Sequence, residues 1–196
     1  MRRACGICVL TISLLLSGCG RAKDAGPMEQ ALDIRQAYLA AEGCDAVMEV
    51  TADYGRRVHH FTAEVTVRGK ETRLTVTGPE EVAGISARLN GRESALTFDD
   101  VILDTGTLDD EGLTVLGALP ALLEAAQSGF IDSCGVEQLG QTDALRVLCR
   151  DPELERGQGR EITLWFDRQS RALCRGEIAV DGVRVIDCTL ERFALC

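Results

Sequence analysis

Apolar and polar residues alternate with a period of two over most of the chain beyond residue 45. In the segment 61–68, every odd-numbered residue is apolar and every even-numbered residue is polar. Because successive side chains of a strand leave opposite faces of a sheet, this pattern predicts strands buried on one face only. Short turns between such segments favour antiparallel pairing. Strands are expected at 46–53, 61–68, 74–77, 94–98, 101–104, 130–139, 144–150, 161–167, 176–180 and 183–191.

The dipeptide Asp181-Gly182 marks the sharpest of the expected hairpins. A two-residue type I′ turn needs positive φ at both central positions, which Asp-Gly tolerates. The turn would pair Val180 with Val183 and Ile178 with Val185, so that all four apolar side chains share one face.

Two segments have helical spacing instead. The first runs from Pro27 or Met28 to about Ala41, since Pro suits the first helical turn and Gly43 follows the expected end. The second covers 113–128 and ends just before Gly129. Each has one wide apolar face, which predicts helices that lie against the sheet. In the first helix that face comprises Ala31, Leu32, Ile34, Tyr38, Leu39 and Ala41.

Composition limits the classes of function. The 196 residues are 45% apolar, enough for a packed core, and this length favours one folded domain, expected at 28–196. The chain carries 21 basic and 31 acidic residues, a formal charge of −10, with no run of Lys or Arg longer than two. Binding to nucleic acid is therefore excluded, because it needs clustered cations.

The first 19 residues have the pattern of an export signal. Arg2 and Arg3 precede an uncharged run at 4–16, which as a helix would span only about 20 Å, too short for a bilayer core. Leu16-Ser17-Gly18-Cys19 resembles the bacterial lipobox, in which the cysteine is acylated and becomes the mature N-terminus. The alternative is an ordinary signal followed by a chance cysteine.

The lipobox resemblance implies three segments: a signal peptide at 1–18, a flexible tether at 19–27 and the folded domain at 28–196. Lipidated Cys19 would anchor the protein to the extracytoplasmic face of the cell membrane, where two acyl chains give stable attachment.

Six other cysteines remain after the signal, and export permits disulfides. A hairpin centred on 140–143 would place Cys134 opposite Cys149, which predicts a cross-strand disulfide; six reduced thiols are the alternative. The Asp181-Gly182 turn instead sends Cys174 and Cys188 to opposite faces, so a bridge between them is not expected unless a bulge intervenes.

No catalytic or metal site is expected. The six cysteines include no C-x-x-C pair, and the adjacent His59 and His60 would leave opposite faces of a strand. Asp104-Thr105-Gly106, preceded by Ile102 and Leu103, resembles the signature of retropepsin-like aspartic proteases. That chemistry needs two carboxylates that share a proton. A strand that ends in a polar turn is the favoured interpretation, and no cofactor is expected.

Trp165-Phe166-Asp167, followed by Ser170 and by Glu177-Ile178, is similar to a W-F-D-x-x-[ST]-x-x-P…E-I stretch of the periplasmic lipoprotein carriers LolA and LolB. Leu173 stands where that pattern has proline. The order of elements over 28–196 also resembles this family. The resemblance implies an α+β, mainly β fold: a single curved antiparallel sheet, open as a half-barrel, covered by an N-terminal and a central helix.

Three segments look more specifically like the clostridial germination lipoprotein GerS group: Pro79–Ile85, Leu103–Gly106 and Leu119–Leu123. This resemblance implies a non-catalytic envelope lipoprotein that supports modification of spore-cortex peptidoglycan by binding and activating a cell-wall amidase.

The carrier family implies a different role, in which the curved face holds the acyl chain of a lipid or lipoprotein. Burial of an acyl chain gains about 25 cal/mol per Å². The apolar residues expected to line such a cavity, with ordinary core as the alternative, are Val65, Val67, Leu74, Val76, Leu164, Phe166, Ile178 and Val180.

Overall fold

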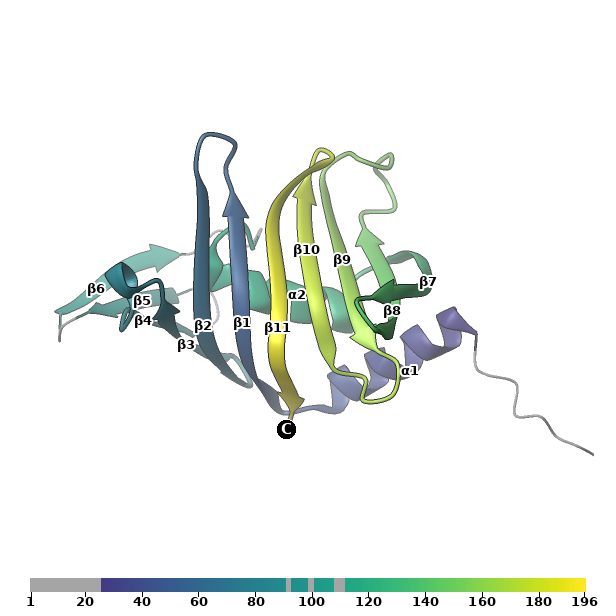
Figure 1. Cartoon of the computed structure of the whole chain (residues 1–196), viewed down its shortest axis with the longest axis horizontal. Coiled ribbons are helices and arrows are strands. Elements are labelled where there is room, and N and C mark those ends of the chain that lie inside the picture. Colours follow the sequence, from purple (N-terminus) through teal and green to yellow (C-terminus); the bar gives the residue numbers. More distant parts are fainter. Residues whose placement is uncertain (1–25, 91–92, 99–100, 108–111) are drawn as a thin grey trace, which may run out of the picture.

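The computed structural model describes residues 26–90, 93–98, 101–107 and 112–196. It contains one antiparallel sheet of eleven strands in the order β6-β5-β4-β3-β2-β1-β11-β10-β9-β8-β7 (Figure 1). The elements are α1 (Pro27–Ala40), β1 (Gly43–Asp53), β2 (Val58–Arg68), β3 (Glu71–Gly78), the 3₁₀ turn η1 (Glu80–Val82), β4 (Ser86–Asn90), β5 (Glu93–Phe98), β6 (Val101–Thr107), α2 (Val115–Ser128), β7 (Ile131–Leu139), β8 (Thr142–Arg150), β9 (Arg160–Asp167), β10 (Leu173–Val180) and β11 (Val183–Leu195).

This architecture confirms the predicted open antiparallel sheet with two covering helices. Strand β4 was not expected from the sequence. It has five residues, of which only Ala87 and Leu89 face the core, so its period-two signal is too short to distinguish from a loop.

The sheet consists of two meanders, β1–β6 and β7–β11, joined where β1 pairs with β11. Helix α2 follows the strand at one edge of the sheet and precedes the strand at the other edge. It therefore has to cross the sheet, and Figure 1 shows it running across one face, with α1 beside it near β7–β10. This connection positions α2 over the residues that would otherwise line an open half-barrel.

Helix α2 inserts its apolar side chains into that face. Ala118, Leu119 and Leu122 have no exposed surface. Leu122 lies over Gly176 of β10, where an added Cβ would come within 2.4 Å of the leucine Cδ1. The absence of a side chain at Gly176 therefore lets the helix approach the sheet closely.

Tyr38 of α1 connects several elements of the core. Its ring makes an edge contact with Phe166 at 5.4 Å between centroids and stacks on Phe193 at 5.7 Å. The Tyr38 hydroxyl donates a hydrogen bond to the backbone carbonyl of Arg171. The side-chain amide of Gln127, on α2, donates to the backbone carbonyl of Tyr38. Burial raises the pKa of the Tyr38 hydroxyl well above its usual range, so the hydroxyl stays a donor.

The β10–β11 hairpin is partly as predicted. Asp181 and Gly182 both have positive φ, and Val180 pairs with Val183. A bulge between Ile178 and Ala179 then shifts the register, so Ile178 pairs with Ile186 and not with Val185. The bulge was not visible in the sequence because both residues are apolar.

The predicted register of the β7–β8 hairpin is wrong. Its turn has two residues, Gly140 and Gln141, because Leu139 pairs with Thr142. Cys134 consequently lies opposite Val147, and a register shift between Ile131 and Ser133 places Cys149 opposite Ile131. The turn is tighter than expected because Gly140 adopts a positive φ of 64°.

No helix in the described part of the chain combines the length and apolarity that a membrane span requires.

The close approach of α2 to the sheet can be tested by adding one methyl group. Gly176→Ala should destabilise the protein by about 1–3 kcal/mol, because Leu122 must move within a filled core. Gly135→Ala is the matched control: it also changes a strand glycine, yet an added Cβ there meets open space, and stability should rise by about 0.5 kcal/mol. Urea unfolding measures both changes. Equal stabilities for the two variants would contradict the described packing.

Candidate functional site

The eight residues predicted to line an acyl cavity lie mainly in the packed core. Six are at most 6% exposed: Val65, Val76, Leu74, Leu164, Phe166 and Ile178. Val67 and Val180 are half-buried. Val65 also lines a surface hollow, together with Asp45 and Arg192. Val67 lines a smaller hollow, together with Tyr38. Burial of the predicted residues is what both an ordinary core and a covered cavity require, so the lining of an acyl cavity by these residues stays a prediction.

A pocket of about 340 Å³ opens where the C-terminal end of α2 meets β8 and β9. Residues from three parts of the chain line it. The last turn of α2 and the link to β7 contribute Glu124, Ala125, Ser128, Gly129 and Phe130; β8 and the following loop contribute Cys149, Arg150, Asp151 and Leu154; β9 contributes Arg160 and Ile162. The volume lies at the lower end of the range for small-molecule sites.

The exit of α2 sets the shape of this pocket. The Gly129 N–H donates to the Ala125 carbonyl and closes the helix. A Cβ at Gly129 would lie 2.7 Å from the Ala125 oxygen and 3.0 Å from the Cys149 Cβ. Arg35 of α1 donates to the backbone carbonyls of Ala126 and Gly129. The positive charge of Arg35 at this position also interacts favourably with the negative end of the α2 helix dipole.

Cys149 lies at the buried inner side of the pocket, with 4% of its surface exposed. Its thiol donates to the Ala125 carbonyl at 3.7 Å. Burial raises its pKa to about 11, so the thiol stays protonated and unreactive at neutral pH. With Ala125 and Ile162 it provides an apolar surface.

Two exposed apolar side chains stand at the mouth of the pocket: Phe130 is 52% exposed and Leu154 is 39% exposed. Leu154 belongs to the loop between β8 and β9, where it packs against Gly159. Apolar residues of this size that remain exposed beside a cavity are typical of binding surfaces.

Asp132 of β7 holds the β8–β9 loop in place. It accepts a hydrogen bond from Arg150 Nε at 2.7 Å and forms an ion pair with Arg156 Nη2 at 2.9 Å, with only 7% of its side chain exposed. Arg150 in turn donates to the carbonyls of Asp151 and Leu154. The hydrogen bond from Arg150 lowers the pKa of Asp132. This network fixes the loop that carries Leu154.

A second, larger hollow of about 840 Å³ is polar. It lies between the start of α1 and the β7–β8 and β9–β10 turns, and its lining is Gln30, Gln138, Gln141, Thr142, Asp143, Asp167, Arg168 and Gln169. The absence of apolar residues from this lining makes it unsuited to an acyl chain.

The residues of the W-F-D stretch have structural roles. Phe166 is in the core, and Asp167 caps the β9–β10 turn by accepting from the backbone N–H groups of Gln169 and Ser170 and from the Ser170 hydroxyl. Trp165 faces the opposite side of the sheet, between the guanidinium groups of Arg146 and Arg175. Leu173, at the proline position of the pattern, is buried opposite Phe166.

Other predicted features are not assembled into a site. Cys134 and Cys149 are free thiols, and their strands do not place them opposite each other, so the predicted disulfide is not formed. Asp104, Thr105 and Gly106 all continue strand β6, which corrects the expected turn. Within the described residues no cluster of His, Cys, Asp or Glu could hold a metal ion. Cys19 lies outside the described residues.

Sequence reasoning missed the residues that form the pocket. Leu154 is the one large apolar residue in the otherwise polar stretch 151–160, and Phe130 directly follows the helix-ending Gly129. Both positions could therefore have been identified from the sequence. The contribution of Asp132 was not accessible, because it depends on an arginine 18 residues away and on another in the loop.

No protein-family signature and no curated protein sequence matches this chain significantly. Solved structures similar to it include a LolA superfamily protein from Nitrosomonas europaea (10% identity, TM-score 0.46, 88% of this chain and 94% of that chain). The lipoprotein LppX from Mycobacterium tuberculosis is another (17% identity, TM-score 0.47, 85% and 92%). A third is a chain in the structure of the Clostridioides difficile CwlD amidase in complex with the GerS lipoprotein (12% identity, TM-score 0.37, 89% and 95%).

The fold is an open antiparallel sheet with two helices on one face, as the sequence predicted. At these identities and TM-scores, the likeness assigns neither a family nor a ligand to this chain.

The role of Asp132 in fixing the loop gives a direct test. Asp132→Asn removes the charge that pairs with Arg150 and Arg156, so trypsin should cleave after Arg156 several-fold faster at pH 8. Glu137→Gln is the control, since Glu137 is on the same strand but pairs with Arg146. Because the folded-state pKa of Asp132 is lowered, its stabilising effect is complete above about pH 4 and is lost as the pH falls through that lowered pKa. Unchanged cleavage of D132N would refute the role.

Proposed function

We propose that this protein is an extracytoplasmic lipoprotein, anchored to the cell membrane through Cys19, that acts by binding and not by catalysis. The domain at 28–196 would bind an acyl group, or an apolar side chain of a lipoprotein or protein partner, in the pocket between α2 and β8–β9. The observation that supports this most is the pocket itself, with its apolar inner surface at Cys149 and Ile162 and its exposed apolar mouth at Phe130 and Leu154.

The size of the pocket favours a small apolar group. At about 30 Å³ per water molecule, 340 Å³ corresponds to roughly eleven waters. That space holds a short acyl segment or one large side chain, whereas the rest of the helix-covered face is filled by α2. A carrier that shields a whole lipid is therefore the less favoured alternative.

A GerS-like accessory role is the second candidate. It is favoured by the filled core, because a protein that binds and activates a cell-wall amidase needs a surface and not a lipid cavity. No residue of the GerS-like segments Pro79–Ile85 or Leu119–Leu123 lines the pocket. Native mass spectrometry separates the candidates: a co-purified acyl ligand supports the carrier, and an empty protein that forms a stable amidase complex supports the accessory factor.

Filling the pocket tests acyl binding. Ser128 is exposed and its hydroxyl bonds only to its own helix at Glu124, so Ser128→Trp should fold and place its indole in the pocket. Binding of a dansyl-labelled undecanoic acid, followed by fluorescence titration, should weaken at least tenfold, or about 1.4 kcal/mol.

The matched control is Val136→Trp, which adds the same indole at a 47%-exposed position of β7 that does not line the pocket. Its affinity should equal that of the unaltered protein. Equal affinity in S128W would show that any acyl group binds elsewhere.

The anchor is tested separately. Cys19→Ala should abolish incorporation of radiolabelled palmitate and release the protein from the membrane fraction, since one residue carries both acyl chains. Persistent palmitate labelling of the variant would disprove lipidation at residue 19.

A further inference from the structure

The tip of the β1–β2 hairpin differs in charge from the rest of the molecule. Residues 53–60 include Arg56, Arg57 and two histidines but only one acid, in a chain of net charge −10. Eight other arginines have carboxylate partners. Arg56 and Arg57 are exposed and form no ion pair within the described residues.

Exposed apolar groups accompany these cations. Tyr54 is 51% exposed and Val58 is 50% exposed. Because β1 pairs antiparallel with β11, the β10–β11 hairpin ends at the same end of the sheet, and there Val183 is 64% exposed. The two hairpins thus present a mixed apolar and cationic surface, which we call the hairpin surface (residues 53–60 and 181–184). Figure 1 shows both loops at one end of the sheet, with the β1–β2 loop projecting furthest.

The tip is held in one shape before any partner binds. Asp53 Oδ1 accepts from the Gly55 N–H at 2.8 Å, and the Tyr54 N–H donates to the Arg57 carbonyl at 3.0 Å. Gly55 supplies the positive φ that this turn requires. The Tyr54 hydroxyl donates to the Leu113 carbonyl, which fastens the tip to the segment before α2. Such order lowers the entropy lost on binding.

We propose that the hairpin surface is the docking site for a protein partner whose contact surface is acidic. Arginine and tyrosine are the residues that most often dominate protein interfaces, and exposed guanidinium groups pair with carboxylates in bidentate geometry. Repulsion by the rest of this acidic chain disfavours every other orientation of an acidic partner. Charge complementarity therefore favours docking at the hairpin surface, where two exposed arginines lie side by side.

A lipid surface suits this region less well. The attraction of two arginines to an anionic membrane is weak and is opposed by the repulsion of the net charge of −10. The Tyr54 hydroxyl is bonded to the domain and is not free for headgroups. Strand β1 starts three residues after the last residue of α1 and has eleven residues. The β1–β2 tip is therefore about 35 Å from the C-terminal end of α1. The proposed anchor, Cys19, precedes α1, and Figure 1 shows the start of α1 at the other side of the molecule from the β1–β2 loop.

This inference rests on the proposed function only in that both require a binding partner. The hairpin surface shares no residue with the pocket. The experiment uses the full-length protein in its host, with a photo-cross-linking amino acid at Val58 or, as control, at Val136. The protein captured at Val58 alone is identified and purified, and its affinity for the full-length chain is measured at 50 and 300 mM NaCl.

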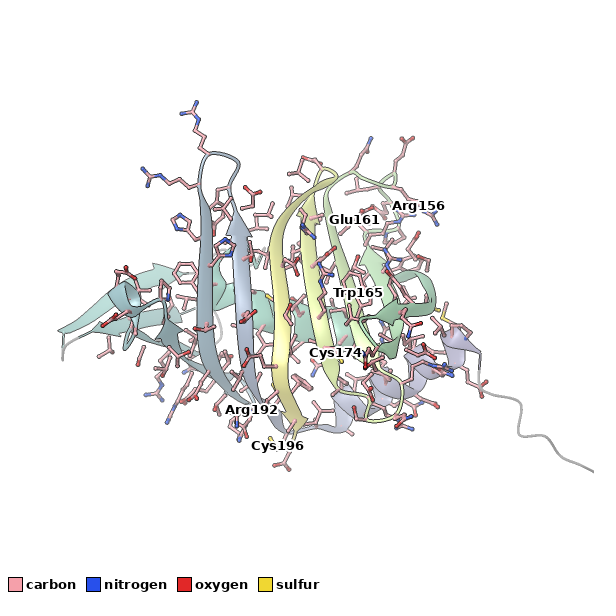
Figure 2. All side chains as sticks on the ribbon, in the orientation of Figure 1. Arg156, Glu161, Trp165, Cys174, Arg192 and Cys196 are labelled. Atoms are coloured by element: carbon pink, nitrogen blue, oxygen red, sulfur yellow. The ribbon has the colours of Figure 1, made fainter. Side chains whose placement is uncertain are left out.

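The decisive variant is Arg56→Glu/Arg57→Glu. The matched control, Lys70→Glu/Arg192→Glu, makes the same change in charge at exposed residues distant from the tip; Figure 2 labels Arg192 at the opposite end of the sheet. The affinity of the captured partner should be lower at 300 mM than at 50 mM NaCl. It should fall at least tenfold in R56E/R57E and change less than twofold in the control.

Any other result overturns the proposal: no specific adduct, an adduct with phospholipid or with a second copy of this chain, or a partner whose affinity is insensitive to R56E/R57E. Ser128→Trp distinguishes the two sites. It should leave this affinity unchanged even where acyl binding is lost, so the failure of one proposal is visible without the other. Circular dichroism and unfolding of R56E/R57E confirm that the loss is not misfolding.

Discussion

The seating of helix α2 on the sheet is the interaction on which the rest of the structure depends. The helix joins strands at opposite edges of one sheet, so it has to cross the face that an eleven-stranded open sheet leaves uncovered. Leu119 and Leu122 fill that face, and Gly176 allows the close contact. Without the helix, the inward side chains of β9 and β10 would be exposed, at a cost of about 25 cal/mol per Å².

The same packing determines where a ligand can bind. Whereas α2 is well packed along its middle, a pocket of about 340 Å³ lies where the helix ends at Gly129 beside β8 and β9. The β8–β9 loop, fixed to Asp132 through Arg150 and Arg156, forms the other wall. An open sheet of this kind can therefore carry a small site at one end of the helix that covers it. The volume left between α2 and the sheet depends on the size of the α2 residues and of the strand residues that they contact.

The sequence was sufficient for the fold class because local and global signals agree. Period-two alternation in 61–68 and the Asp181-Gly182 turn predicted strands and a hairpin that exist, and the helix ends near Pro27 and Gly129 were marked by the expected residues. Strand register was less accessible. The Ile178–Ala179 bulge lies between two apolar residues, and the turn at Gly140-Gln141 lies in a polar stretch that allows a turn of two or of four residues. Each shifted a predicted pair. Six of the eight predicted cavity residues are buried, but sequence alone could not show that Leu122 packs against Gly176.

Methyl NMR of the protein titrated with dodecanoate tests most directly whether α2 fills the sheet and leaves one pocket at its end. The account predicts chemical-shift changes at the methyl groups of Ala125, Leu154 and Ile162, with none at Leu119, Leu122 or Ile178. Shifts at Leu119, Leu122 and Ile178 would show that the helix moves off the sheet to admit a chain, and would contradict the filled core described above.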